Sequence, residues 1–548
     1  MEMEMFNSKW IATVASIWIQ CSCGASYTFG IYSSILKSTQ DYDQSTLDTV
    51  SVFKDIGANA GVISGLLYSA VTLNRNRQRL GVFGAPWVVH AAGAIQCFFG
   101  YFMMWASVVG LIPRPPVPVM CLFMWIAAHA QTFFNTSNVV SGVHNFGDYG
   151  GTIVGIMKGF LGLSGAMLIQ FYDTVCKGNP STFILVLAVT PTFVSLLFMT
   201  LVRNYDTYSK DDKKHLNSFS AIALLIAAYL TINIIVENIF TMPFWLRVLT
   251  FSVLILLVVS PLGIALKAQR ESSDSYAQSL LEERGYKSNL AVSSNSSTTE
   301  NPTDYHPLPS GEGGEAKADH GSSSFEDMNL FHAMATVNFW LLFIAMICGL
   351  GSGLATINNI SQVGESLGYT TIERNSLVAL LSIWNFLGRF GAGFVSDIFL
   401  HRRGWARPLF MAITQALLAT GHIVIASGFS KNLYLGSILI GISYGSQWSL
   451  MPTITSEIFG VGHMGTIFNT IAIASPLGSY IFSVRVIGYI YDKAAAGEDK
   501  TCVGNRCFML SFLIMAAVAL FGALVALVIF FRTRRFYQQI VLKRLHHS

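Results

Sequence analysis

The chain has 548 residues, of which 52% are hydrophobic and 12% are charged, and its mean hydropathy is +0.51. Soluble domains carry about 25% charged residues, so the composition excludes a soluble protein of this size. The net charge of +4 is small, and nothing in the sequence resembles a nucleic-acid site, so we expect no nucleic-acid partner.

Apolar segments of about 20 residues or more, the length that a membrane span needs, follow one another along the chain. The predicted spans are 10–36, 48–73, 81–111, 118–142, 150–172, 181–202, 217–238, 244–266, 332–361, 374–397, 408–428, 433–455, 465–490 and 508–531. The seventh and eighth are the least distinct. The sequence therefore predicts an all-α polytopic membrane protein with 12 to 14 transmembrane helices.

Basic residues gather between alternate spans and after the last one. The clusters are Arg75, Arg77 and Arg79; Arg203, Lys210, Lys213 and Lys214; Arg402, Arg403 and Arg407; and Arg532, Arg534, Arg535, Lys543 and Arg544. An even number of spans places all of them on one face together with both termini. Cytoplasmic loops carry the excess of Lys and Arg, so both termini are predicted to be cytoplasmic.

One long polar stretch, 268–331, interrupts the apolar pattern. It has almost no large apolar side chains and cannot bury enough surface to fold alone. We interpret it as a disordered cytoplasmic linker, with a regulatory module as the alternative. It separates an N-terminal six-helix bundle (1–203) and a probable extra helix pair (204–267) from a C-terminal six-helix bundle (332–531), which a basic cytoplasmic tail follows (532–548).

The two halves contain similar local sequences. Phe146 precedes a glycine-containing loop and then Gly151–Thr152 at the start of a predicted span, and Phe459 precedes Gly465–Thr466 in the same way. Such internal repeats are expected when a transporter is built from two related bundles around a central site.

A stretch of small residues ends in a charged loop after the second span of the C-terminal half. Gly393 and Asp397, followed by Arg402 and Arg403, resemble the cytoplasmic loop motif of the major facilitator superfamily in its second-half copy. The resemblance implies two six-helix bundles. It also implies that the aspartate latches the N-terminus of a neighbouring helix in the outward-open state.

The first-half copy of this motif is degraded, because Gly65 is present but Ser69 stands where the acidic residue is expected. The N-terminal half otherwise resembles the plant nodulin-like branch, which includes nuclear-fusion-defective-like proteins and is similar to oxalate/formate-type antiporters. The residues that carry this resemblance are Lys9–Trp10, Cys23–Gly24, Tyr27, Phe29–Gly30, Tyr32–Ser33 and Phe53–Gly61. The resemblance implies a membrane carrier in a plant, without naming a substrate.

Charged residues inside spans are costly in lipid unless they are paired or face water. Lys158 lies about 10 residues into its span, roughly 15 Å deep at 1.5 Å per residue, and could bind an anionic substrate or a carboxylate partner. Alternatively, it snorkels towards the cytoplasm along its four-carbon stem. Arg485 lies near the outer end of the corresponding second-half span, where snorkelling is easier. Together they favour a carboxylate-bearing substrate.

Polar side chains recur on the first and fourth predicted helices of each half, which line the central cavity in the superfamily. The candidate substrate-binding residues among them are Tyr27, Gln131, Asn135, Asn358, Asn359 and Gln447. Amides commonly join spans by hydrogen bonds, so each could instead be a helix–helix contact. Collectively they predict a polar cavity.

Cysteine spacing predicts no metal centre. Cys502 and Cys507 fall in a loop placed outside the cytoplasm, where a disulfide is permitted; two free thiols are the alternative. The sequence has no Walker loop, which argues against an ATP-driven pump, and we expect no cofactor.

Taken together, these features predict a secondary active or facilitative transporter of a small polar solute, with an organic anion ranked first, that works by alternating access. A proton or counter-anion is a possible coupled species. A non-transporting membrane sensor or scaffold is the alternative, and a membrane enzyme ranks below it. We expect a monomer in the plasma membrane or in a vacuolar or other endomembrane.

Overall fold

The computed structural model describes residues 8–73, 85–176, 179–205, 212–240, 242–273, 327–429, 431–494 and 502–541. Over these ranges the chain is helical, with short loops and no β-strand. Most of the predicted linker, Arg75, Arg77, Arg79, Lys210 and the end of the basic tail lie outside the described residues.

Up to residue 273, the described residues form eight helical stretches. They are α1 (Lys9–Ser22) with η2 (Gly24–Thr28) and α2 (Phe29–Gln40), α3 (Gln44–Asn59) with α4 (Val62–Thr72), α6 (Trp87–Val108), α7 (Val117–Asn145), η3 (Gly147–Tyr149) with α8 (Gly150–Val175), α9 (Pro180–Phe198) with η4 (Met199–Leu201), α10 (Asp212–Ile239) and α11 (Phe244–Val259), whose helical stretch continues to Ser273.

Six further stretches follow residue 327. They are α13 (Leu330–Met334) and α14 (Val337–Met346) with η5 (Ile347–Gly351) and α15 (Ser352–Ser366), α16 (Thr371–Arg403), α17 (Pro408–Ala426), α18 (Asn432–Phe459), α19 (Met464–Ala472) with α20 (Ala474–Ser479), η6 (Tyr480–Gly488) and α21 (Tyr489–Ala494), and η7 (Asn505–Cys507) with α22 (Met509–Phe536) and η8 (Tyr537–Val541).

Every predicted span coincides with one of these helical stretches. Eleven of them are long and apolar enough to cross a membrane by length and composition. The other three, 9–40, 371–403 and 432–459, are also of spanning length but contain more polar residues or a helix break. The all-α polytopic fold is confirmed, whereas the number of membrane-crossing helices, predicted as 12 to 14, stays a prediction.

The first span differs from its prediction because it is broken near its middle. After α1 ends at Ser22, the chain makes one 3₁₀ turn and then continues as α2. A β-carbon on Gly24 would collide with Ser164 of α8. The glycine therefore lets the backbone approach α8 closely, and the turn presents the next side chains, Tyr27 among them, towards the centre of the protein.

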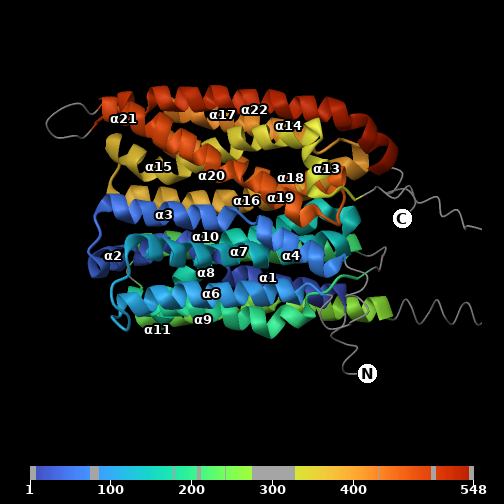
Figure 1. Ribbon diagram of the computed structural model, residues 1–548, viewed down its shortest axis with the longest axis horizontal. Coiled ribbons are helices and arrows are strands. Elements are labelled where there is room, and N and C mark those ends of the chain that lie inside the picture. The colour runs from blue at the N-terminus through green and yellow to red at the C-terminus, as the bar shows by residue number, and fades with distance from the viewer. Residues whose placement is uncertain are drawn as a thin grey trace, which may run out of the picture.

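The helices run side by side in two layers, the first half of the chain in one and the second half in the other (Figure 1). α1 begins and α22 ends at the same end of the bundle, which also holds the end of α16. We call this the basic end, and it contains Lys9, Arg403 and Tyr537. The apolar side chains fill both layers and the seam between α8 and α16, where Phe386, Phe390 and Phe160 are buried.

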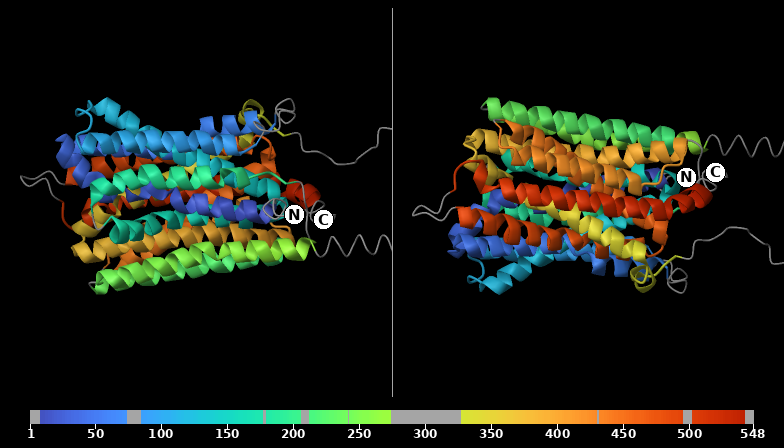
Figure 2. Two further views of the ribbon diagram at one scale, coloured as in Figure 1. Left: turned by 90° about the horizontal axis from the view of Figure 1, so that it is seen from below. Right: turned by 90° about the horizontal axis from the view of Figure 1, so that it is seen from above.

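The helix pair α10–α11 packs against the first half. At the basic end the Lys9 ammonium contacts the Asp212 carboxylate at 2.7 Å, and both side chains are buried. Further along, the Trp18 indole nitrogen donates to the Val258 carbonyl at 2.8 Å. α11 consequently lies at one edge of the bundle, as Figure 2 shows, while α10 contacts both α8 and α16.

Candidate functional site: a central cationic cavity and a charged latch

A cavity of about 40 Å³ lies between the two halves. Its lining comes from helices of both halves and contains no carboxylate. The lining residues are Tyr27, Ala58, Asn59, Gln131, Thr132, Asn135, Lys158, Leu161, Arg389, Trp448, Phe468, Asn469 and Ala472. The predicted candidates Lys158, Tyr27, Gln131 and Asn135 therefore meet in one place.

Lys158 is only 3% exposed, which excludes a snorkelling side chain with its ammonium in bulk water. Its ammonium lies over two rings from the second half, 5.1 Å from the centre of Trp448 and 5.4 Å from that of Phe468. Cation–π contacts of this kind contribute about 0.5–2 kcal/mol each. They replace only part of the hydration that a buried ammonium loses.

Arg389, on α16, is the second buried cation of the cavity and is also 3% exposed. Its guanidinium donates to Asn385 Oδ1 on its own helix at 2.9 Å. It reaches across to the first half at two points, the Lys158 carbonyl at 3.1 Å and the Tyr27 hydroxyl at 3.2 Å. All three acceptors are neutral. Within the described ranges, neither Lys158 nor Arg389 forms an ion pair with a carboxylate.

Neutral polar groups complete the wall. The Gln131 side-chain carbonyl accepts from the Ser26 hydroxyl at 2.5 Å, and that of Asn135 accepts from Gln20 at 3.4 Å. Asn469, from α19, donates to Thr136 Oγ1 of the first half at 2.7 Å. These contacts make each amide part of a helix–helix hydrogen bond, while its remaining atoms border the cavity.

Four predicted binding residues lie away from this cavity. Asn358 and Asn359 donate to Ser479 and Ser483, between α15 and the helical stretch α20–η6. Gln447 is fully buried against Gly349 in η5. Arg485 is exposed, with its guanidinium 5.9 Å from the Tyr480 ring centre. The buried cation that accompanies Lys158 is Arg389 rather than Arg485.

The latch motif forms a contact between the two halves at the basic end. Asp397, at 3% exposure, accepts from the Gly151 N–H at 3.2 Å, the Thr152 N–H at 2.5 Å and the Thr152 hydroxyl at 2.6 Å. These donors belong to the first turn of α8, where free N–H groups and the helix dipole favour a negative charge. The α16 carboxylate thus caps the N-terminus of α8.

Close approach of the two backbones makes this cap possible. A β-carbon on Gly393 would collide with the Gly151 carbonyl, and one on Gly151 would collide with Gly393 and Asp397. Only residues without a side chain at both positions allow α8 and α16 to cross at this distance.

Arg407, at the start of α17, is the arginine that neutralises the latch. It is 1% exposed and contacts Asp397 Oδ1 at 2.5 Å, Ser396 Oγ at 2.5 Å and Glu457 Oε1 at 2.6 Å. Tyr537 donates to the other oxygen of Glu457 at 2.6 Å. The two arginines named by the motif do not form this ion pair. Arg403 lies over the Phe399 and Trp405 rings, and Arg402 lines a pocket beside the latch.

The degraded first-half motif occupies a matching crossing between α4 and α19. A β-carbon on Gly65 would collide with Gly465 and Thr466. The Ser69 hydroxyl lies 3.5 Å from Thr466 Oγ1 and 3.4 Å from the Gly462 carbonyl. This crossing keeps the small residues but has a serine where the other has a charged cap.

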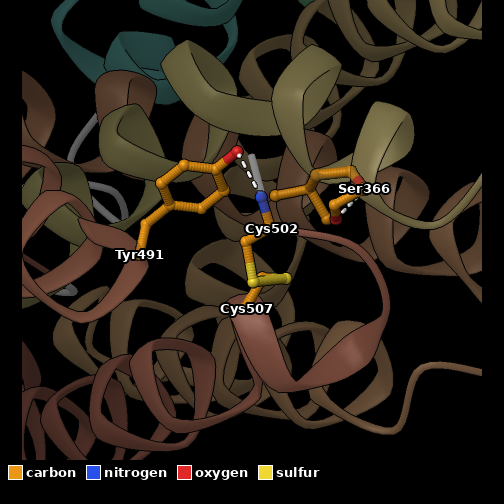
Figure 3. The surroundings of a disulfide bond; sticks show 5 residues. Ser366, Tyr491, Cys502 and Cys507 are labelled. Atoms are coloured by element: carbon orange, nitrogen blue, oxygen red, sulfur yellow. Dashed lines mark hydrogen bonds between the residues drawn. A yellow bond between two sulfur atoms is a disulfide. The ribbon is translucent and has the colours of Figure 1, made fainter. Parts of the chain in front are cut away.

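At the opposite end of the bundle the structure joins Cys502 to Cys507 by a disulfide (Figure 3). The Cys502 N–H donates to the Tyr491 hydroxyl at 3.3 Å, and the Gly504 N–H donates to the Ser366 carbonyl at 2.8 Å. The short loop therefore ties the end of α15 to α21 and α22.

Sequence reasoning missed Arg389 and Arg407 as site residues. Arg389 stands in the middle of a predicted span, which was itself a signal of functional charge, but the glycines around it favoured an interpretation as packing. Arg407 follows Asp397 by ten residues, and the sequence alone does not show that α17 begins beside Asp397.

Family comparisons cover both halves. A family model described as Nodulin-like matches residues 9–266, and one described as the C-terminal domain of NFD4 matches residues 324–539. Residues 9–266 therefore resemble the Nodulin-like family, and the fold is that of major facilitator superfamily transporters. The fold and the similarity to probable transporters support a membrane transporter.

Relatives of the chain include Protein NUCLEAR FUSION DEFECTIVE 4 of Arabidopsis thaliana, 24% identical over 97% of this chain and 90% of the relative. Probable transporter MCH1 of Yarrowia lipolytica is 24% identical over 34% of this chain and 40% of the relative. Among solved structures, the proton:xylose symporter XylE has a TM-score of 0.52 at 12% identity and covers 94% of each chain. This last likeness concerns the fold alone.

Proposed function

We propose that this transporter carries a small organic anion with at least one carboxylate, by alternating access. The observation that supports this proposal is the pair of buried cations, Lys158 and Arg389, in one cavity whose lining has no carboxylate. Two unneutralised charges of one sign are costly to bury. A bound anion would offset that cost, so the site favours anions over neutral or cationic solutes.

The two cations suit a carboxylate in different ways. A guanidinium presents its N–H groups as a planar fork that matches the two carboxylate oxygens, whereas an ammonium acts as a compact point charge. Arg389 now donates to the neutral Tyr27 hydroxyl and the Lys158 carbonyl. A carboxylate is a stronger hydrogen-bond acceptor than either group. If the substrate carboxylate replaced them as the partner of Arg389, a contact between the two halves would be lost.

Access to the cavity is consistent with a carrier closed at one end. The Asp397 cap and the Ser69–Thr466 contact join the halves at the basic end. Gly165 lies two turns of α8 beyond Lys158, on the side away from the basic end, and Tyr27 packs beside it. The Tyr27 side chain is 46% exposed. Solute would therefore enter past Tyr27, and opening of the latch would release it at the basic end.

The positions of the basic residues support a cytoplasmic basic end, with both termini on that side. We further propose that the transporter works as a monomer in the plasma membrane or in a vacuolar or other endomembrane. A proton or a counter-anion would be the coupled species.

Flux into proteoliposomes tests the proposal. Purified protein would be supplied with labelled carboxylates, amino acids, sugars and inorganic anions, with and without a pH gradient. We expect saturable uptake of a carboxylate, lost in Lys158→Met and retained in Arg485→Gln, which removes a positive charge outside the cavity. Uptake of a neutral solute alone, or normal carboxylate uptake by Lys158→Met, would contradict it. Solute binding without flux would favour a sensor.

A further inference from the structure

A second pocket, of about 230 Å³, opens at the basic end between α8, α10 and α16. It is separate from the central cavity. Its polar wall includes Lys213 of α10 and His401 and Arg402 of α16, and its apolar wall includes Leu216, Phe394 and Ile398. We propose that this pocket binds a phosphate group, either as a lipid headgroup or as a free phosphate ester, and that the ligand holds the latch closed.

The charge of the pocket favours an anion. Its one carboxylate, Asp397, is already neutralised by Arg407 and by the N–H groups of Gly151 and Thr152. Lys213 and Arg402 are exposed and have no ion pair among the residues that the structure describes. Two cationic side chains on different helices thus converge on one pocket in which the acidic group is already paired.

His401 is held in a fixed orientation at the same pocket. Its Nδ1 lies 2.7 Å from the backbone carbonyl oxygen of Asp397. A carbonyl oxygen can only accept a hydrogen bond, so Nδ1 carries the hydrogen. The ring also stacks on Tyr149 of η3, with 5.0 Å between centroids. Nε2 is left as the ring nitrogen that a ligand can use. Lys213 and Arg402 supply donors for phosphate oxygens. The Nε2 of the neutral ring can accept from a phosphate hydroxyl, and it becomes a donor when the ring is protonated.

The position of the pocket connects it to the latch. Thr152 and Asp397, which bond to each other across the two halves, both line its wall. α10 packs against both α8 and α16. A phosphate that contacts Lys213 and Arg402 would strengthen the link between α10 and the end of α16. The ligand would stabilise the state in which α8 and α16 cross closely, and would be released when they separate.

Matched pairs of variants test this site, because each basic residue has a neighbour of the same charge outside the pocket. Lys214 contacts Glu271, and Arg403 lies over the Phe399 and Trp405 rings. The double variant Lys213→Gln/Arg402→Gln and the control Lys214→Gln/Arg403→Gln remove the same net charge from the same helix ends. Thermal unfolding verifies that both remain folded.

Binding would be measured by native mass spectrometry of protein from nanodiscs that contain phosphatidic acid in phosphatidylcholine. Inorganic phosphate and glycerol 3-phosphate would be titrated separately while thermal unfolding is monitored. We expect the pocket variant to lose about thirtyfold in apparent affinity, the size expected for two basic residues near an anionic lipid surface. The control should stay within about twofold of the wild type.

The two ligand arms identify the source of the phosphate. Retention of phosphatidic acid without an effect of the soluble phosphates identifies a lipid headgroup, and stabilisation by the soluble phosphates identifies a free phosphate ester. Equal losses in the pocket and control variants would overturn the proposal, because they would show attraction to bulk surface charge. Failure of both phosphate sources to bind the wild type would overturn it as well.

Discussion

The α8–α16 and α4–α19 crossings are two versions of one arrangement. Each brings a glycine of one half against the Gly–Thr start of a helix in the other half. In the first, Asp397 lies 2.6 Å from Thr152 Oγ1 and also accepts two backbone N–H groups. In the second, Ser69 lies 3.5 Å from Thr466 Oγ1. Small residues suffice for close contact, but only one crossing has a charged cap.

This difference shows how a buried charge can be structural at one site and functional at another. Asp397 is surrounded by donors and by Arg407, which in turn contacts Glu457. Lys158 and Arg389, at similar burial, meet only neutral groups and rings. Fully paired charges hold a fold in one state, whereas unpaired charges of one sign leave a place for a ligand.

The largest expected effect comes from giving the first crossing the side chain of the second. Asp397→Ser would leave Arg407 with Glu457 as its one carboxylate partner among the described residues and would remove the cap of α8. Breaking a buried pair costs about 3–5 kcal/mol, so thermal unfolding in detergent should show a large loss of stability. Asp397→Asn, which keeps the size and hydrogen-bonding reach, should lose less. Wild-type stability in Asp397→Ser would remove the distinction between the two crossings.

A smaller effect tests the backbone contact itself. A β-carbon on Gly393 would collide with the Gly151 carbonyl, whereas one on Gly391 of the same helix meets no atom within 4 Å. Gly393→Ala should cost about 1–3 kcal/mol through overpacking. Gly391→Ala should be neutral or slightly stabilising, because alanine favours helices. Equal unfolding temperatures for the two variants would argue against close contact at the latch.

Hydroxyl removal compares the crossings directly. Thr152→Val deletes a hydrogen bond to a buried carboxylate, and such bonds contribute about 1.5–3 kcal/mol. Thr466→Val deletes only a long contact to a neutral hydroxyl and should cost less than about 0.5 kcal/mol. Unfolding measurements on both variants in one detergent decide this, and a larger loss in Thr466→Val would reverse our ranking of the two crossings.

The smallest effect is a gain. Ser69→Asp places a carboxylate beside the start of α19, where a helix N-terminus favours a negative charge by about 0.3–1 kcal/mol. The added cap should keep the basic end closed for longer and slow transport by about twofold to fivefold. Ser69→Asn, which lacks the charge, serves as the control. Faster flux in Ser69→Asp would indicate that the first-half crossing does not restrain opening.

Much of the fold could be predicted from the sequence, because membrane spans leave long apolar runs and basic loops. The helix break after Ser22 could not, since it depends on Gly24 meeting Ser164 of a distant helix. Asp397 was predictable as a cap from its motif. Its partner Arg407 was not, because the pairing depends on how α17 packs against α16 and α18.

The cavity was predictable only in part. Sequence position gives the depth of a residue in a span but not the direction its side chain faces when helices are broken. Lys158, Gln131 and Asn135 therefore reach the cavity, whereas Gln447 packs against Gly349 on another face of its helix. Arg485 lies in the second-half span that corresponds to the span of Lys158, but its side chain is exposed. The neutral partners of Arg389 that belong to the other half could not be predicted, because the contact depends on how the two halves pack.

The central claim is that Lys158 and Arg389 form a site for a carboxylate. Its most direct test is thermal unfolding of purified protein with acetate and succinate, because a ligand that binds the folded state at a hundred times its dissociation constant stabilises it by about 2.7 kcal/mol. Our account predicts that a carboxylate stabilises the wild type and Arg485→Gln but does not stabilise Lys158→Met. Without ligand, Lys158→Met should be more stable than the wild type by about 1 kcal/mol, because the variant lacks an unpaired buried charge. Equal stabilisation of Lys158→Met and the wild type would contradict the claim.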